Sequence, residues 1–246
     1  MRTATRELLV TMAVLVAAAS ARADWDPGDQ YKMHFPQLPD LETGVDVLAT
    51  MSGPEYNVSL ADDFRCTQTG PITSIHIWSS WLNNVRRAAP SFIIQIHADI
   101  PAGTGDIPYS RPGDVLKGWA SMTPSGERLY ATANEDFYDP VAGEVIGSDT
   151  QVWQYNFDVS ADPFQQQDGT IYWLRLAFLE LGAAELFGWK TSLDRWNDSG
   201  VFYRASTEEY EPLGHDLAFV IVPEPATMGL LSLGLVGLVA RRKRRK

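Results

Sequence analysis

Cysteine is almost absent from this chain of 246 residues, which contains only Cys66. A single thiol cannot form an intramolecular disulfide framework, and it cannot build a zinc site made of several cysteines. Stability must therefore come from a packed core rather than from covalent cross-links. An isolated cysteine beside Arg65 is also more typical of a buried structural residue than of an activated thiol.

Basic residues are scarce between the two ends of the chain. Lys and Arg number 20 against 31 Asp and Glu, which gives a formal net charge of −11 at pH 7. Nine of the basic residues lie within residues 1–23 and 241–246, so the segment between these ends is strongly acidic. A negative field argues against nucleic acid and anionic membrane surfaces as partners of that segment.

Familiar catalytic motifs are missing as well. The sequence has no Gly-x-Ser-x-Gly elbow and no His-Glu-x-x-His helix. His76, His97 and Asp99 fall on the less apolar faces of two predicted strands, so that the two histidines would be cross-strand neighbours. Zinc would need three such ligands to converge, and ordinary hydrogen-bonded histidines in a sheet are the stronger interpretation.

The first 23 residues have the three parts of a secretory signal peptide. Arg2 and Arg6 precede a mostly apolar run over residues 8–19, and Ala21 and Ala23 supply the small side chains that signal peptidase requires. We therefore predict cleavage after Ala23. The alternative is a retained anchor helix, which the shortness of the apolar run disfavours.

A second apolar stretch covers residues 226–240. As a helix it would be about 22 Å long, against about 30 Å for a hydrocarbon core, and snorkelling Arg241 and Arg242 would bridge part of the difference. The stretch has almost no polar face, which favours a membrane segment. The basic tail 241–246 then stays cytoplasmic, and residues 24–222 lie on the far side of the membrane.

The order of features at this end resembles a known sorting signal. Pro223, Glu224 and Pro225 are followed by the apolar helix and then by the basic tail that begins with Arg241 and Arg242. This arrangement resembles the PEP-CTERM sorting signal of Gram-negative-type bacteria. The resemblance implies recognition by an exosortase, a membrane cysteine protease, with removal of the tail and delivery to the cell surface or extracellular polysaccharide matrix. A C-terminal anchor that is never processed is the alternative.

The segment between the two signals, residues 24–222, reads as one all-β domain. Runs rich in β-branched and aromatic residues recur at short intervals and are bounded by Pro, Gly, Asp or Asn. The clearest runs are 72–81, 92–98, 115–121, 151–159, 171–178 and 217–222, with weaker ones at 129–133, 186–191 and 201–204. This pattern predicts a β-sandwich of jelly-roll-like type, with a closed sheet as the alternative.

Several stretches of this segment resemble an uncharacterised secreted domain family associated with planctomycete-type and PEP-CTERM proteins. They include Leu-Ala-Asp-Asp-Phe-Arg-Cys at 60–66 and further motifs at 69–78, 96–101, 153–157, 187–192, 195–198 and 214–221. The resemblance extends over most of the exported segment and informs its fold and boundaries. It implies no activity and assigns no site residues.

Acidic groups in predicted loops make calcium the most plausible cofactor. Ca²⁺ takes six to eight oxygen ligands, which clustered loop carboxylates and backbone carbonyls can supply. Asp62, Asp63 and Asp136 are the favoured ligands. No group has the ligand spacing of an EF-hand, and the competing interpretation is that these residues begin turns by bonding to their own backbone.

Aromatic residues provide the strongest sign of binding. The eight tryptophans are many for one domain, and exposed Trp rings can stack on sugars. Large rings also fill cores, so only the least securely buried ones, Trp81, Trp189 and Trp196, are predicted to contact a glycan.

We therefore expect a non-enzymatic protein of the cell surface or extracellular matrix that contacts polysaccharide. Its processing partners would be signal peptidase and exosortase, and its C-terminal helix would anchor it transiently. The alternative is a secreted polysaccharide-active hydrolase that uses an acidic pair, since glycoside cleavage needs two carboxyl groups about 5–10 Å apart and the exported segment is rich in acidic residues.

Overall fold

Strand segments with alternating apolar residues dominate the computed structural model, which describes residues 24–53, 56–179 and 185–223. In β6 (Phe92–Ile100), Phe92, Ile94 and Ile96 are fully buried, whereas Gln95 between them is half-buried. This period of two is the one expected for a strand that presents one face to a core. The described part of the chain is all-β, as predicted, and its helical segments are two single 3-10 turns, η1 (Leu82–Asn84) and η2 (Thr104–Asp106).

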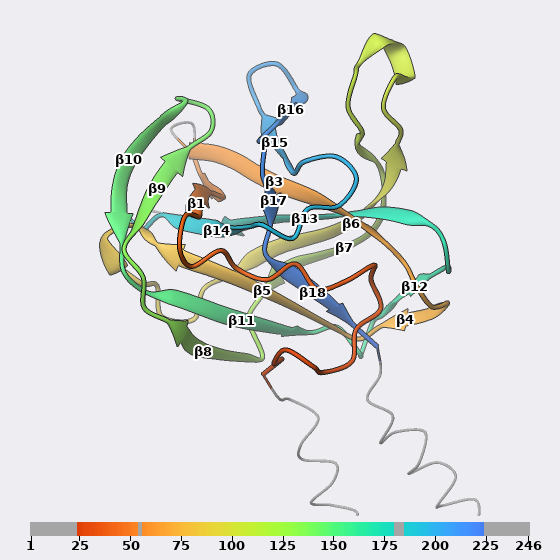
Figure 1. The fold of residues 1–246 in the computed structure, drawn as a ribbon, viewed down its shortest axis with the longest axis horizontal. Coiled ribbons are helices and arrows are strands. Elements are labelled where there is room, and N and C mark those ends of the chain that lie inside the picture. Colours follow the sequence, from red (N-terminus) through yellow and green to blue (C-terminus); the bar gives the residue numbers. More distant parts are fainter. Residues whose placement is uncertain (1–23, 54–55, 180–184, 224–246) are drawn as a thin grey trace, which may run out of the picture. The chain divides into compact units, whose positions relative to one another are not determined.

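Two large sheets account for most of the strands (Figure 1). The first sheet has the order β10 (Glu144–Asp149), β9 (Glu135–Asp139), β1 (Val45–Leu48), β14 (Phe187–Ser192), β5 (Ser74–Trp81), β11 (Val152–Asp158), β8 (Gly126–Ala131), with β17 (Asp216–Leu217) on β14 and β18 (Phe219–Val222) on β5. The second sheet has the order β16 (Glu209–Pro212), β15 (Val201–Arg204), β3 (Tyr56–Arg65), β2 (Thr50–Ser52), β13 (Ile171–Leu179), β6, β7 (Arg111–Met122). A small separate pair joins β12 (Phe164–Gln166) to β4 (Gly70–Ile72).

Aromatic rings fill the space between the sheets. Phe92 of β6 contacts Phe157 of β11 and Phe187 of β14, with ring centroids 5.3 and 5.0 Å apart. Trp81 of β5 meets Phe178 of β13 edge to face at 5.0 Å. These contacts join the two sheets into the predicted sandwich. Its jelly-roll-like connectivity stays a prediction, and the pairs β1–β9 and β2–β13 are parallel.

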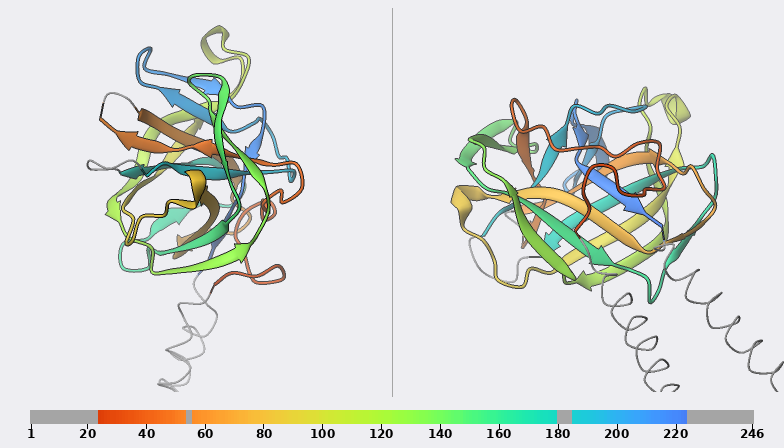
Figure 2. Two further views of the ribbon diagram at one scale, coloured as in Figure 1. Left: turned by 90° about the vertical axis from the view of Figure 1, so that its left-hand side faces the viewer. Right: turned by 60° about the horizontal axis from the view of Figure 1, so that its bottom comes forward.

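The first sheet curls at one end. Strand β10 comes to lie against η1, the turn that follows β5, and Asn84 exchanges two hydrogen bonds with Thr150, at 2.9 and 3.0 Å. The bent β9–β10 hairpin is visible in Figure 1 and from a second side in Figure 2. The curl encloses one face of β1 and β14, where the candidate site lies.

The segment that follows the predicted signal peptide covers the outward face of the first sheet. Trp25 meets Trp78 of β5 edge to face at 5.9 Å, and its carbonyl oxygen accepts hydrogen bonds from Arg128 and Gln154. Figure 1 shows this segment crossing in front of β5. Strand β5, at the centre of the first sheet, is therefore buried on both of its faces.

The predicted signal peptide, the predicted membrane helix and most of the sorting signal fall outside the described residues. Ala21 and Ala23, the predicted helix over 226–240, and Glu224, Pro225, Arg241 and Arg242 all lie in residues 1–23 and 224–246. Among the residues that are described, no helix has the length and apolar character needed to cross a membrane.

Candidate functional site

A buried group of charged side chains lies inside the curl of the first sheet. Asp46 of β1 is directly opposite Lys190 of β14, and Glu135 of β9 is directly opposite Asp149 of β10. Because β9 also pairs with β1 in parallel, Glu135 lies diagonally next to Asp46 on the same face. The strand registers thus bring together four residues that are far apart in sequence, which we call the Asp46 cluster.

The Asp46 cluster is sealed from solvent. Lys190 and Asp46 are 0 % exposed, and Asp149 and Glu135 are 2 % and 5 % exposed. The Lys190 Nζ atom lies 2.7 Å from Glu135 Oε2 and 3.8 Å from Asp46 Oδ2. One oxygen from each of the three carboxyl groups lies within 4.8 Å of the others. Three acidic groups thus share one cation among the described residues.

Burial changes the proton affinity of two of these groups. Burial raises the pKa of Asp46 well above its usual value, against the opposing effect of the Lys190 charge. Burial, followed by the charge of Glu135, raises the pKa of Asp149 to about 7. Asp149 is therefore partly protonated at neutral pH when no further cation is bound beside it.

Two glycines allow close packing in the curl around the cluster. A Cβ atom on Gly188 of β14 would lie 2.7 Å from the Phe137 ring and 2.9 Å from Asp46 Cβ. A Cβ atom on Gly147 of β10 would lie 2.6 Å from Leu82 of η1. Residues without a side chain at these positions allow the sheet to curl tightly around the carboxyl groups.

The predicted calcium ligands do not form such a site. Asp62 and Asp63 lie within strand β3 rather than in a loop, and the loop expectation was wrong because both side chains find partners inside the fold. Asp62 accepts hydrogen bonds from Gln37 and the Leu217 N–H, whereas Asp63 accepts one from Asn197. Consecutive strand residues point to opposite faces, so these carboxyl groups diverge. Asp136 is exposed on β9.

Two of the three predicted glycan-stacking tryptophans are core residues. Trp81 is 1 % and Trp189 0 % exposed, and their indole nitrogens donate to Tyr155 Oη and the Ala218 carbonyl oxygen. The expectation that they are accessible was wrong because both side chains point between the sheets. Trp196 is half-buried and stacks on His34, with ring centroids 4.4 Å apart.

The two histidines considered as zinc ligands do not converge in the described part of the chain. His76 lies on β5 and His97 on β6, which belong to different sheets, so they are not cross-strand neighbours. His76 contacts Asn156 Oδ1 at 2.6 Å, and His97 contacts the Gly113 carbonyl oxygen at 2.8 Å. Asp99 accepts a hydrogen bond from Trp173. The interpretation as hydrogen-bonded sheet histidines is confirmed.

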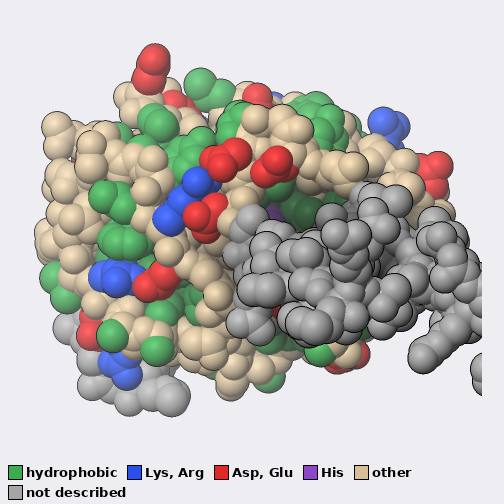
Figure 3. Space-filling model, turned by 90° about the horizontal axis from the view of Figure 1, so that it is seen from below, with side chains coloured by type: hydrophobic (Ala, Val, Ile, Leu, Met, Phe, Trp, Pro, Cys, Tyr) green, Lys and Arg blue, Asp and Glu red, His purple; other side chains and the backbone are tan. Residues whose placement is uncertain are grey.

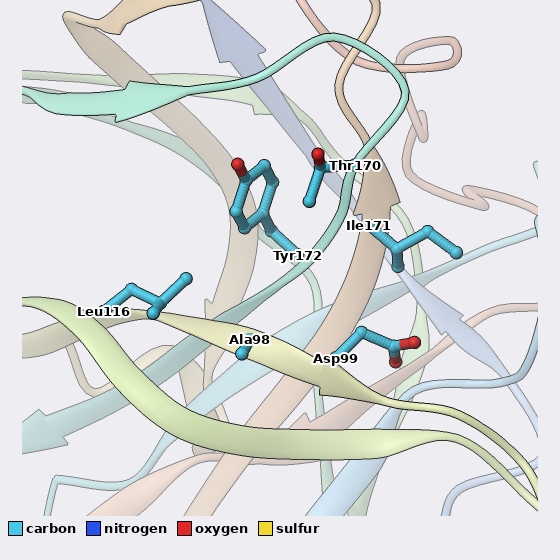
Figure 4. Close-up of a pocket in the computed structure, with 6 residues that line it drawn as sticks. All are labelled: Ala98, Asp99, Leu116, Thr170, Ile171 and Tyr172. Atoms are coloured by element: carbon cyan, nitrogen blue, oxygen red, sulfur yellow. The ribbon is translucent and has the colours of Figure 1, made fainter.

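An open hollow of about 360 Å³ lies at the surface beside β6, β7 and β13 (Figure 4). It is lined by Ala98, Asp99, Leu116, Thr170, Ile171 and Tyr172. Asp99 supplies the carboxylate of this lining, and burial raises its pKa. On the face of the described residues that Figure 3 shows, acidic side chains are dispersed and several lie beside basic ones.

Two comparisons with protein families match this chain. A family model for a domain of unknown function, DUF7901, matches residues 33–225. The chain belongs to the DUF7901 family. A model of the PEP-CTERM protein-sorting motif matches residues 222–245, which include Pro223, Glu224 and Pro225 and also Arg241 and Arg242. No curated protein and no solved structure matches the chain.

These matches confirm both resemblances seen in the sequence. The PEP-CTERM motif implies that this DUF7901 protein is processed by an exosortase and exported to the cell surface or the extracellular space. The DUF7901 match adds the boundaries of the domain and leaves its activity open.

The Asp46 cluster was not predicted from the sequence of this DUF7901 protein. Its neighbour Asp136 is a predicted calcium ligand, but Asp46, Glu135, Asp149 and Lys190 are not among the predicted site residues. A usable signal was present, since Asp46 interrupts the apolar run Val45–Leu48 and Lys190 interrupts the aromatic strand Phe187–Ser192. Charged residues of opposite sign in two buried strands indicate an internal ion pair.

Proposed function

We propose that this DUF7901 protein is an exported matrix or surface component whose β-domain contacts polysaccharide and catalyses no reaction. A signal peptide over residues 1–23 starts export, and signal peptidase removes it after Ala23. The helix over residues 226–240 then holds the chain in the membrane until exosortase removes the tail. The processed domain remains at the cell surface or in the extracellular polysaccharide matrix.

The observation that carries this proposal is that the sorting motif follows the last strand of the folded domain without an intervening segment. Strand β18 ends at Val222 and pairs with β5 over Phe219–Val222, and Ile221 is fully buried. The motif begins within one residue of that strand. The whole domain is therefore the cargo of the sorting signal, with no linker or further domain between them.

The burial of the most perturbed carboxyl groups supports a role without catalysis. Asp46 and Asp62, whose pKa values are raised well above the usual range, are both 0 % exposed. A general acid must reach the glycosidic oxygen of its substrate. A polysaccharide chain cannot reach either group in this fold.

Trp196 is the aromatic side chain that best fits a glycan contact. It lies in the loop between β14 and β15 and is half-buried. His34 covers one face of its ring at 4.4 Å, with an angle of 22° between the ring planes. A sugar would stack on the other face, supported by a histidine that fixes the ring in place.

A hydrolase is the second candidate, and one pair of residues favours it. Asp99 borders the open hollow, and Asp198 lies close enough to raise its pKa further. An acid with a raised pKa beside a second carboxylate is the arrangement of a glycosidase. We rank this candidate second because Asp198 is committed to the Ser110 N–H at 2.8 Å.

A glycan array tests both candidates. The full-length protein in detergent should bind at least one class of acidic or neutral polysaccharide, and Trp196→Ala should weaken that binding about tenfold, because stacking on one ring contributes roughly 1–1.5 kcal/mol. Trp153→Ala is the matched control, since Arg86 already covers that half-buried ring at 4.2 Å.

Two results would contradict the proposal. If the protein binds no glycan on the array, the proposed contact with polysaccharide is wrong. Release of new sugar ends by the wild type, lost in Asp99→Asn, would establish the hydrolase instead.

A further inference from the structure

Unsatisfied oxygen atoms are concentrated in the Asp46 cluster. All six carboxyl oxygens of Asp46, Glu135 and Asp149 are inaccessible to solvent, and Glu135 Oε2, which contacts Lys190 at 2.7 Å, is the one that an ammonium donor approaches closely among the described residues. A buried carboxylate without donors loses its hydration and gains little in return. Five such atoms in one place indicate a group that protein donors satisfy only in part.

The hydroxyl of Ser80 gives an independent sign of a ligand. Ser80 of β5 is 0 % exposed and is directly opposite Gly188 of β14, two residues from Lys190 and on the same face. Its oxygen lies beside Asp149 but has no partner in regular hydrogen-bond geometry. A neutral oxygen is therefore aimed into a group of carboxyl oxygens, as in a cation site.

The separation of the oxygens is compatible with one bound cation. One oxygen from each carboxyl group lies within 4.8 Å of the others. Ca²⁺ binds oxygen at about 2.3–2.6 Å, so two of its ligands can be up to about 4.6–5.2 Å apart. The three oxygens are therefore close enough together to bind one calcium ion.

The formal charge of the cluster also favours a bound divalent cation. If all three carboxyl groups are ionised, they face one ammonium group, and two negative charges remain in a region from which water is excluded. Lys190 contacts Glu135 through Oε2 and so leaves Oε1 and the two aspartates for a second cation. A divalent ion brings the formal charge of the group to zero.

We propose that Asp46, Glu135 and Asp149 bind one calcium ion, with the Ser80 hydroxyl as a further ligand. These side chains come from β1, β9, β10 and β5, so the ion joins the curled hairpin to the centre of the first sheet. Lys190 is a positioning residue that holds the Glu135 carboxylate. The ion has a structural role, because the site is closed to any larger ligand.

The test uses the full-length protein in detergent, freed of metal with a chelator and then titrated with calcium chloride alone. Calorimetry should show one site per chain. Calcium at about a hundredfold excess over its Kd should raise the midpoint of thermal unfolding by about 5–10 °C. Wild-type protein that neither binds calcium nor gains thermal stability would overturn the proposal.

Variants locate the ion. Asp149→Asn should weaken calcium binding at least about tenfold, because it removes one of three charged ligands. Asp136→Asn is the matched control, since this exposed carboxyl group is next to Glu135 on β9 but on the other face. If Asp149→Asn does not fold, Ser80→Ala keeps every charge and should weaken binding severalfold. Equal affinity in these variants and the control would place the ion elsewhere.

Discussion

At the scale of single residues, the buried aspartates of β3 have the largest electrostatic consequence outside the Asp46 cluster. Burial raises the pKa of Asp63 to about 8, against a hydrogen bond from Asn197, and the charge of Asp216 raises it further. Asp216 itself has a pKa raised to about 6, chiefly by burial. An unfolded aspartate titrates near 3.9. These residues therefore bind protons more strongly in the folded protein.

The sign of the resulting pH dependence follows from this difference. Between about pH 4 and pH 8, Asp63 keeps its proton in the folded state and loses it in the unfolded state. Stability therefore falls as pH rises through this window, by up to about 1.4 kcal/mol per pH unit for one proton. The contribution is fully present below pH 4 and is lost above pH 8.

We predict that Asp63→Asn makes the free energy of unfolding less dependent on pH between pH 5 and pH 7. The change in slope should correspond to up to one proton, or about 1.4 kcal/mol per pH unit. Denaturant unfolding at several pH values, in the presence of a chelator, measures it. Asp114→Asn, at an exposed position of β7, is the control and should leave the slope unchanged. A slope that Asp63→Asn does not alter would show that this carboxyl group is ionised in the folded protein.

At the scale of elements, most strands could be predicted from the sequence and some could not. The runs 92–98, 171–178 and 201–204 were recognised because apolar and β-branched residues dominate them, and they became β6, β13 and β15. Strands β3 and β9 were missed because their acidic residues look like turn formers. Their partners come from distant segments, such as Gln37 and Leu217 for Asp62, and local patterns do not reveal such partners.

The same limit applies to the candidate site. Asp46 and Asp149 are about a hundred residues apart in the chain and become neighbours only through the pairing of β10 with β9 and of β9 with β1. The parallel β1–β9 pair is not joined by a short turn, so no turn motif in the sequence indicates that these strands are neighbours. The burial of Trp81 and Trp189 was missed for a related reason, since the local sequence does not show whether an aromatic residue of a strand faces the core or the solvent.

Close packing of the curl leads to a prediction at this scale. Gly188→Ala should destabilise the protein by about 1–3 kcal/mol, because the new Cβ atom would lie 2.7 Å from Phe137 and 2.9 Å from Asp46 Cβ. Gly118→Ala in β7 is the matched control, with its nearest neighbour atom at 3.7 Å. Unfolding midpoints in urea measure both. Equal midpoints for the two variants would contradict the tight packing.

At the scale of the whole molecule, the folded domain limits where the sorting tail can be removed. Strand β18 is paired to β5 up to Val222. A cut before Phe219 would remove a strand whose residues Phe219, Val220 and Ile221 are fully buried. Exosortase processing that preserves the domain must therefore occur at or after Val222.

We predict that mass spectrometry of the mature protein finds its C-terminus at or beyond Val222. Glu224→Ala should leave an unprocessed, membrane-retained form, because it removes the charged residue of the motif. Glu208→Ala, at an exposed position in a turn of the domain, is the control and should be processed normally. An unchanged mature mass in Glu224→Ala, or a C-terminus within β18, would contradict this prediction.

The two ends of the described segment are fastened to the same part of β5. Asp24 accepts a hydrogen bond from Asn156, which is directly opposite His76, and Val222 is directly opposite Ser74. Ser74 and His76 are two residues apart, so both ends leave the domain at one pole. A segment attached at either end would therefore join the domain at that pole, and the β15–β16 hairpin lies on the opposite side of the domain in Figure 1.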